Sequence, residues 1–138
     1  MEKSILNNNF ILLAEDDEDD QELIRMAFSH VTSTHRFEIV SNGQKVLESL
    51  QEHSNLPCLI ILDLNMPVLN GFQTLIAMRN DARLQHVPKV ILTTSDDNES
   101  KKKSFSYGAV DYFVKPASMD DFIFTAQKML TYCDKYDI

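Results

Sequence analysis

The 138-residue sequence lacks tryptophan and has few residues that break regular structure, with only three glycines and four prolines. It contains no low-complexity tract and no repeat at solenoid spacing, which excludes fibrous and repeat architectures. Hydrophobic residues make up 43% and charged residues 25%, the balance of an ordinary globular protein. A chain of this length can bury a core without disulfide or metal support, so we expect one globular domain.

Positive charge is also scarce. Lysine and arginine number 13 against 21 aspartates and glutamates, which gives a formal net charge of -8. Proteins that bind nucleic acid usually present a basic face that displaces counterions from the phosphates, so direct DNA binding is not expected. The longest basic run is 101–103, and a short run of this kind is typical of a solvated face.

Long apolar stretches and a cysteine framework are absent as well. No segment reaches the roughly 20 apolar residues of a membrane span, and the N-terminus has no sustained apolar region of a secretory signal. The two cysteines, Cys58 and Cys133, lie far apart without metal-ligand spacing, and Cys58 sits in an apolar run where an unpaired cysteine packs as a small hydrophobic residue. We therefore expect a cytoplasmic protein in a reducing compartment, without membrane association.

Short apolar runs alternate with segments of helical periodicity, which predicts a parallel sheet with helices on both faces. The expected strands are 10–14, 37–40, 59–62, 89–94 and 111–114. The expected helices are 19–29, 43–51, 71–79, 98–107 and 119 to about 132, and 80–89 is expected to form a loop. The fold class is thus α/β with a doubly wound five-stranded sheet, in which ligands bind at the carboxyl ends of the strands.

Chemically distinctive side chains stand at those carboxyl ends: Glu15, Asp16, Asp63, Thr93 and Lys115. Three carboxylates in a small volume repel one another unless a cation neutralises them. Mg2+ prefers oxygen ligands and takes one or two carboxylates together with phosphate oxygens. Lys115 and Thr93 can neutralise and orient a phosphoryl group, and Asp63 can be the nucleophile that forms an aspartyl phosphate.

Taken singly, each of these residues has an ordinary explanation. Acidic residues are common at helix starts, threonine is common in strands, and lysine is common on surfaces. Their expected convergence on one edge of the sheet is what favours a functional site.

The sequence resembles the receiver domains of two-component response regulators over nearly its whole length, from about Phe10 to Leu130. The motifs that carry the resemblance are ILLAEDD (11–17), LIILDLNMPVLNG (59–71), VILTTS (90–95) and GAVDYFVKP (108–116). The resemblance implies a flavodoxin-like (βα)5 fold with strand order 2-1-3-4-5, which receiver domains share with flavodoxin. It also implies that 1–138 is a single receiver domain, with its core at about 10–132 and no output domain.

The resemblance assigns the acidic residues to a phosphorylation site. Asp63 matches the phosphoacceptor, and Glu15 and Asp16 match the acidic pair that binds Mg2+, although the family often has aspartate at the first position. Asn65 matches the position whose backbone carbonyl completes the metal shell.

The remaining matched residues imply a switch. Lys115 is similar to the lysine that contacts the phosphoryl oxygens, and its bond to Pro116 is expected to be cis, as in relatives. Thr93 and Tyr112 match the hydroxyl and aromatic residues that move together on phosphorylation. The added charge is then expected to alter the face around 98–132, which in relatives controls partner binding.

A signalling module rather than an enzyme is therefore implied. Its phosphoryl donor would be a sensor histidine kinase or a histidine phosphotransfer protein, its downstream target is an unknown protein, and homodimerisation is compatible with the family. The segment TTSDDNE (93–99) and the loop 80–89 more weakly resemble small regulators that accompany phytochrome-type kinases.

Three alternative functions fit the sequence less well. An aspartate-nucleophile phosphatase needs a general acid two residues after its nucleophile, where this sequence has Asn65. A receiver fold that docks partners without phosphorylation generally lacks the acceptor, one of the acid pair or the lysine, and here all are present. A flavin site needs a phosphate-binding loop after the first strand, where the acidic run 15–20 would repel phosphate.

Overall fold

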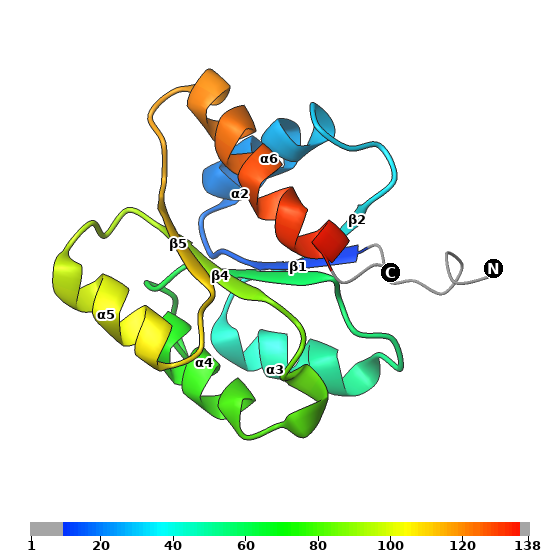
Figure 1. Ribbon diagram of the computed structural model, residues 1–138, viewed down its shortest axis with the longest axis vertical. Coiled ribbons are helices and arrows are strands. Elements are labelled where there is room, and N and C mark those ends of the chain that lie inside the picture. Colours follow the sequence, from blue (N-terminus) through cyan, green and yellow to red (C-terminus); the bar gives the residue numbers. More distant parts are fainter. Residues whose placement is uncertain (1–9, 136–138) are drawn as a thin grey trace.

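The computed structural model describes residues 10–135, in which one parallel sheet lies between two layers of helices (Figure 1). The strands are β1 (Phe10–Ala14), β2 (Arg36–Val40), β3 (Leu59–Leu62), β4 (Lys89–Thr93) and β5 (Asp111–Val114). The helices are α2 (Glu18–Ser29), α3 (Gly43–Glu52), α4 (Gly71–Arg79), α5 (Asn98–Ser106) and α6 (Met119–Lys135), with a short 3-10 helix η1 (Ala82–Leu84). The strand order is β2-β1-β3-β4-β5, which confirms the expected fold and order.

The sheet buries both of its faces because successive side chains of each strand point to opposite sides. In β1, Leu12 and Ala14 pack with α3 and α4, whereas Ile11 and Leu13 pack with α2 and α6. Figure 1 shows these two helical layers on either side of the sheet. The uninterrupted apolar runs of the sequence are thus the signature of strands covered twice.

Polar side chains fix where each helix begins. The side chains of Asp17, Asn42, Asn70 and Asp97 each accept a hydrogen bond from a backbone N–H in the first turn of the helix that follows. Ser118 does the same for α6, as expected, through the N–H of Asp121 at 3.2 Å. Such caps satisfy donors that a helix cannot satisfy internally, and each contributes about 1 kcal/mol.

The loop expected at 80–89 contains the helical turn η1, which the sequence analysis missed. Asp81 accepts hydrogen bonds from the backbone N–H of Arg83 at 3.0 Å and from its guanidinium at 3.0 Å. Leu84 is buried in the core. A single capped turn has no periodicity from which it could be recognised.

Helix α5 is held more weakly than its neighbours. Within it only Ser104 is buried, and the chain leaves it through Gly108 with φ of 113°, a left-handed conformation that favours glycine. This agrees with the expectation of a helix with few apolar anchors, and such elements open most readily.

The cysteines correct one expectation. Cys58 precedes β3 and Cys133 lies near the end of α6, and the two are joined as a disulfide, so the expectation of unpaired cysteines was wrong. Their separation of 75 residues hides the pairing in the sequence, because only the packing of α6 against the sheet brings them together.

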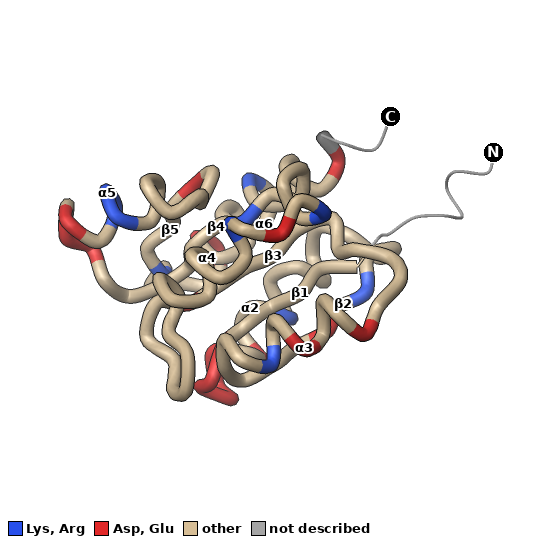
Figure 2. Tube along the Cα trace, turned by 90° about the horizontal axis from the view of Figure 1, so that it is seen from below, with Lys and Arg blue, Asp and Glu red and all other residues tan. Residues whose placement is uncertain are grey.

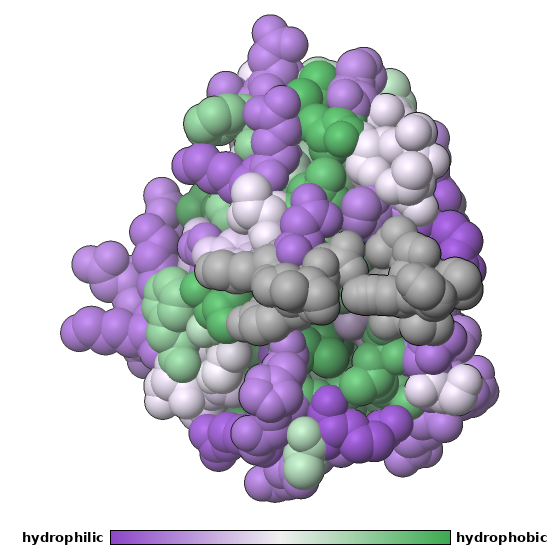
Figure 3. Space-filling view, turned by 45° about the vertical axis from the view of Figure 1, so that its right-hand side comes forward, coloured by the Kyte–Doolittle hydropathy of each residue, from purple (hydrophilic) through white to green (hydrophobic). Residues whose placement is uncertain are grey.

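The molecular face in Figure 3 is largely hydrophilic, with small separate hydrophobic groups. Among residues 10–135, no helix combines the length and the hydropathy that crossing a membrane requires. Partly exposed apolar side chains occur on and around α5, β5 and α6. They are Phe105, Val110, Val114 and Phe124.

Candidate functional site

Three acidic side chains meet at the carboxyl edge of the sheet, as the sequence predicts. Glu15 follows β1 and Asp63 follows β3, and these strands pair in parallel up to Ala14 and Leu62. The N–H of Asp63 donates to the carbonyl of Ala14 at 3.2 Å, so the backbone holds the two carboxylates side by side. One carboxylate oxygen from each of Glu15, Asp16 and Asp63 lies within 4.8 Å of the other two.

The acidic residues differ in their access to water. Glu15 and Asp63 are buried, at 1% and 6% exposure, whereas Asp16 is exposed. Figure 2 shows acidic residues gathered where the strands end. The cluster is therefore open on one side, as a site must be if it exchanges ligands with solvent.

Lys115 reaches into this cluster from the end of β5. Its Nζ lies 2.8 Å from Glu15 Oε1, 2.9 Å from Asp63 Oδ2 and 2.7 Å from Asp20 Oδ2. The side chain is only 8% exposed, and the backbone N–H of Lys115 donates to the carbonyl of Thr93 at 2.7 Å. The sheet thus places the ammonium group within hydrogen-bond distance of three carboxylates.

Asp20 was not among the predicted site residues. It lies in the first turn of α2, where an acidic residue is explained by the helix dipole alone. The acidic run 15–20 was visible in the sequence, but only the fold shows which of its members turns toward Lys115.

The charges of the site perturb one another. Burial raises the pKa of Glu15 to about 7, an effect that Asp63 reinforces and that the hydrogen bond to Lys115 opposes. Burial on its own would lower the pKa of Lys115, but hydrogen bonds to Asp20, Asp63 and Glu15 raise it above the ordinary lysine value. Three carboxylates thus contact a single ammonium and Asp16 lies beside two of them, so the acidic residues outnumber the positive charge of the site.

The donor set fits a hard divalent cation. Glu15, Asp16 and Asp63 offer only carboxylate oxygens, the ligands that Mg2+ prefers. The side chain of Asn65 is exposed, and its backbone N–H donates to Asp63 Oδ1 at 3.2 Å. The contribution of its carbonyl to a metal shell stays a prediction.

Thr93 and Tyr112 lie beside the acidic cluster on β4 and β5. The Thr93 hydroxyl is fully buried and has no hydrogen-bond partner within residues 10–135. The Tyr112 hydroxyl donates to the carbonyl of Ser95 at 2.6 Å. A buried hydroxyl without a partner destabilises the fold. An acceptor that enters the site and bonds the Thr93 hydroxyl would therefore be stabilising.

The loop after Asp63 is tightly packed and contains one strained residue. Gly71 begins α4 so close to the end of β3 that a Cβ there would lie 2.6 Å from the Asp63 carbonyl oxygen. Val68 has φ of 67°, a left-handed conformation that a β-branched residue rarely adopts. Strained backbone of this kind persists only where its surroundings impose it.

One expectation about this region was wrong. The Lys115–Pro116 peptide bond is trans, as are all described peptide bonds. The trans form is the intrinsically preferred one, and with it the Lys115 side chain already contacts all three carboxylates.

Comparison with known proteins identifies the family to which this fold belongs. The profile of the response regulator receiver domain matches residues 11–127. The chain belongs to this family. Receiver domains are modules of two-component signalling. In this structure Glu15, Asp63 and Lys115 lie together at the carboxyl ends of the strands, as the sequence predicts.

Two curated relatives cover most of this receiver domain. The probable methanogenesis regulatory protein FilR2 of Methanothrix harundinacea is 32% identical over 88% of this chain and 81% of its own. The response regulator Rcp1 of Synechocystis is 31% identical over 80% of this chain and 79% of its own.

Solved structures agree. The Mn(2+)-bound form of Rcp1 superposes with a TM-score of 0.77 at 29% identity, covering 88% of this chain and 91% of that chain. The phosphorylated cyanobacterial phytochrome response regulator RcpA superposes with a TM-score of 0.82 at 26% identity, covering 91% and 94%.

Proposed function

We propose that this receiver domain accepts a phosphoryl group on Asp63 in the presence of Mg2+ and thereby controls the binding of a protein partner. The observation that carries the proposal is the Asp63 carboxylate, which lies beside two further acidic ligands and within 2.9 Å of the Lys115 ammonium. The donor would be a phosphohistidine of a sensor histidine kinase or of a histidine phosphotransfer protein.

In the proposed transfer, Asp63 is the only residue that forms a covalent bond. A carboxylate oxygen of Asp63 attacks phosphorus, the phosphorus–nitrogen bond of the donor breaks, and its electron pair returns to the imidazole. Bound Mg2+, held by Glu15, Asp16 and Asp63, would neutralise charge on the phosphoryl oxygens. Lys115 supplies a positive charge to the same oxygens from the end of β5.

The switch follows from the buried hydroxyl of Thr93. Phosphorylation adds about 1.5 to 2 negative charges and three acceptor oxygens, and Thr93 has no other acceptor in the described chain. Its movement toward the phosphoryl group would free space for Tyr112, which now bonds the Ser95 carbonyl. The structural change would then reach α5, the least anchored helix.

We propose the face of α5, β5 and α6, within 98–132, as the surface that binds the downstream protein or a second receiver domain. It carries the exposed Phe105, Val114 and Phe124. The proposal also places the protein in the cytoplasm, where this domain acts through protein contacts and without binding DNA.

The proposal is tested by intact-mass spectrometry after incubation with acetyl phosphate or phosphoramidate, with Mg2+ or with a chelator. We expect one phosphoryl adduct that requires Mg2+ and is absent in Asp63→Asn. Asp81→Asn is the matched control, because Asp81 caps η1 away from the site, and it should be labelled like the wild type.

Two outcomes would contradict the assignment. Labelling of Asp63→Asn at the wild-type level would show that another residue is the acceptor. A folded wild-type protein that binds Mg2+ but takes no phosphoryl group from either donor would favour a docking module that works without phosphorylation.

A further inference from the structure

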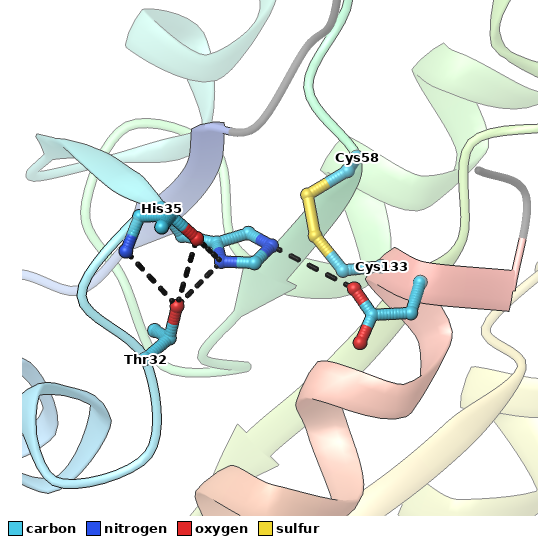
Figure 4. Close-up of a disulfide and its surroundings, with 6 residues drawn as sticks. Thr32, His35, Cys58 and Cys133 are labelled. Atoms are coloured by element: carbon cyan, nitrogen blue, oxygen red, sulfur yellow. Dashed lines mark hydrogen bonds and ion pairs between the residues drawn. A yellow bond between two sulfur atoms is a disulfide. The ribbon is translucent and has the colours of Figure 1, made fainter. Parts of the chain in front are cut away.

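A second group of potential ligands lies at the opposite edge of the sheet from Asp63. Cys58 precedes β3, His35 precedes β2, and Cys133 lies near the end of α6. The two sulfur atoms and one ring nitrogen of His35 lie within 4.8 Å of one another. Figure 4 shows the imidazole beside the paired cysteines.

The imidazole is held in a defined orientation. His35 Nδ1 is hydrogen-bonded to Thr32 Oγ1 at 2.6 Å, and the side chain is only 10% exposed. When Nδ1–H donates to this hydroxyl, Nε2 is the unprotonated nitrogen, and it lies on the side of the ring toward the cysteines (Figure 4). Metal-binding histidines are typically fixed in this way by a partner on the other ring nitrogen.

A fourth donor stands next to the histidine. Asp134 Oδ1 lies 3.8 Å from His35 Nε2, too far for a hydrogen bond. Nitrogen and oxygen ligands of a tetrahedral zinc ion lie about 3.4 Å apart when each is about 2.1 Å from the metal. The observed separation would let both side chains approach one ion, but Asp134 is not part of the group whose ligand atoms all lie within 4.8 Å of one another. The site therefore rests on the two cysteines and His35.

We propose that Cys58, Cys133 and His35 form a zinc site, with the exposed Asp134 or water as the fourth ligand, and that this site becomes available when the Cys58–Cys133 disulfide is reduced. Two thiolates and an imidazole suit Zn2+, whereas the all-oxygen cluster at Asp63 suits Mg2+. The protein thus has two chemically distinct metal sites, one at each edge of the sheet.

The redox and metal steps balance. A dithiol reductant gives two electrons and two protons to the disulfide, which becomes two thiols while the reductant becomes a disulfide. Zn2+ then displaces one proton from each thiol and binds both sulfurs as thiolates. The disulfide and the zinc complex exclude each other, because the complex requires both sulfurs as thiolates.

Both the disulfide and the zinc complex would connect the end of α6 to the start of β3. The disulfide joins the end of α6 to the start of β3, and the zinc ion would add the connection between α2 and β2 through His35. Dithiol reductants are abundant in the cytoplasm, where the zinc form is expected to prevail. The proposal stands on these contacts and does not depend on phosphorylation of Asp63.

The test uses the full chain, reduced with a phosphine that is then removed, in excess Mg2+ to occupy the acidic site. Alkylation and mass spectrometry first verify two free thiols. Titration with Co2+, a spectroscopic substitute for zinc, is expected to give thiolate charge-transfer and tetrahedral d–d absorption at one ion per chain. Competition with a chromogenic chelator then measures zinc affinity.

Matched controls isolate the ligands. The oxidised protein retains every acidic residue but should show neither absorption. His35→Ala should bind zinc at least tenfold more weakly, and His86→Ala, which removes an exposed histidine elsewhere, should bind like the wild type. Thr32→Val should weaken binding by about 10-fold or more through loss of the imidazole's partner.

Three results would overturn the proposal. One is a reduced protein without thiolate–cobalt absorption. The second is a His35→Ala variant that binds zinc as tightly as His86→Ala. The third is a disulfide that survives reductant in the folded protein, because the site would then never form.

Discussion

Replacing Lys115 with methionine should show how much the mutual repulsion of the acidic side chains lowers the unfolding free energy. The ammonium lies 2.7–2.9 Å from three carboxylates and is 8% exposed. Without it, the oxygens of Glu15 and Asp63 face each other within 4.8 Å. At an effective dielectric constant of about 20, two charges at that distance repel by about 3 kcal/mol.

We therefore expect Lys115→Met to lose about 3 kcal/mol of unfolding free energy at pH 8 in a chelator, the lower end of the cost of breaking a buried ion pair. The loss is limited because Glu15, with its pKa already raised to about 7, can take up a proton. Mg2+ at 100 times its dissociation constant adds about 2.7 kcal/mol. It should bind the variant more tightly than the wild type, because no ammonium competes with it.

Urea denaturation of both proteins, with chelator and with Mg2+ at one fixed concentration, measures these differences. The gap between wild type and variant should narrow when Mg2+ is present. Lys45→Met, which removes an exposed lysine of α3, is the control and should change little. A variant as stable as the wild type in chelator, or a gap that Mg2+ widens, would refute the electrostatic reasoning.

Three further predictions follow from individual contacts. Thr93→Val removes a buried hydroxyl without a partner and should raise the unfolding free energy by about 1 kcal/mol in urea; a loss of stability would show that the hydroxyl is satisfied. Val68→Gly relieves the left-handed backbone and should stabilise by about 1 kcal/mol, with unchanged labelling of Asp63. The Tyr132 hydroxyl donates to Asp111 at 2.6 Å, and this bond, with burial, raises the pKa of Tyr132 to about 12. Its contribution of about 1 kcal/mol is therefore complete below pH 10 and lost toward pH 12. The stability difference between wild type and Tyr132→Phe should shrink over that range, and a constant difference would contradict the assignment.

Local patterns were sufficient to predict most of the fold. The buried strands are continuous apolar runs, and their expected bounds agree with the structure to within one residue. The helix starts agree equally well, because capping residues such as Asn70 and Ser118 act on the next turn and are visible in sequence. The one missed element, η1, is a single turn without periodicity.

The sequence also determined which residues would meet at the acidic site. Glu15, Asp63, Thr93 and Lys115 each end a strand or directly follow one, and the parallel sheet brings those ends together. The alternation of strands and helices in the sequence therefore implied the convergence.

The tertiary structure alone decided the contacts between segments that no local rule connects. It turned Asp20 toward Lys115, left the Thr93 hydroxyl without a partner, kept the bond before Pro116 trans, and paired Cys58 with Cys133 across 75 residues. The physical reason is the distance along the chain over which each interaction acts. Hydrophobic periodicity and capping act over a few residues, whereas these contacts depend on how α2 and α6 pack against the sheet and on the path the chain takes between them.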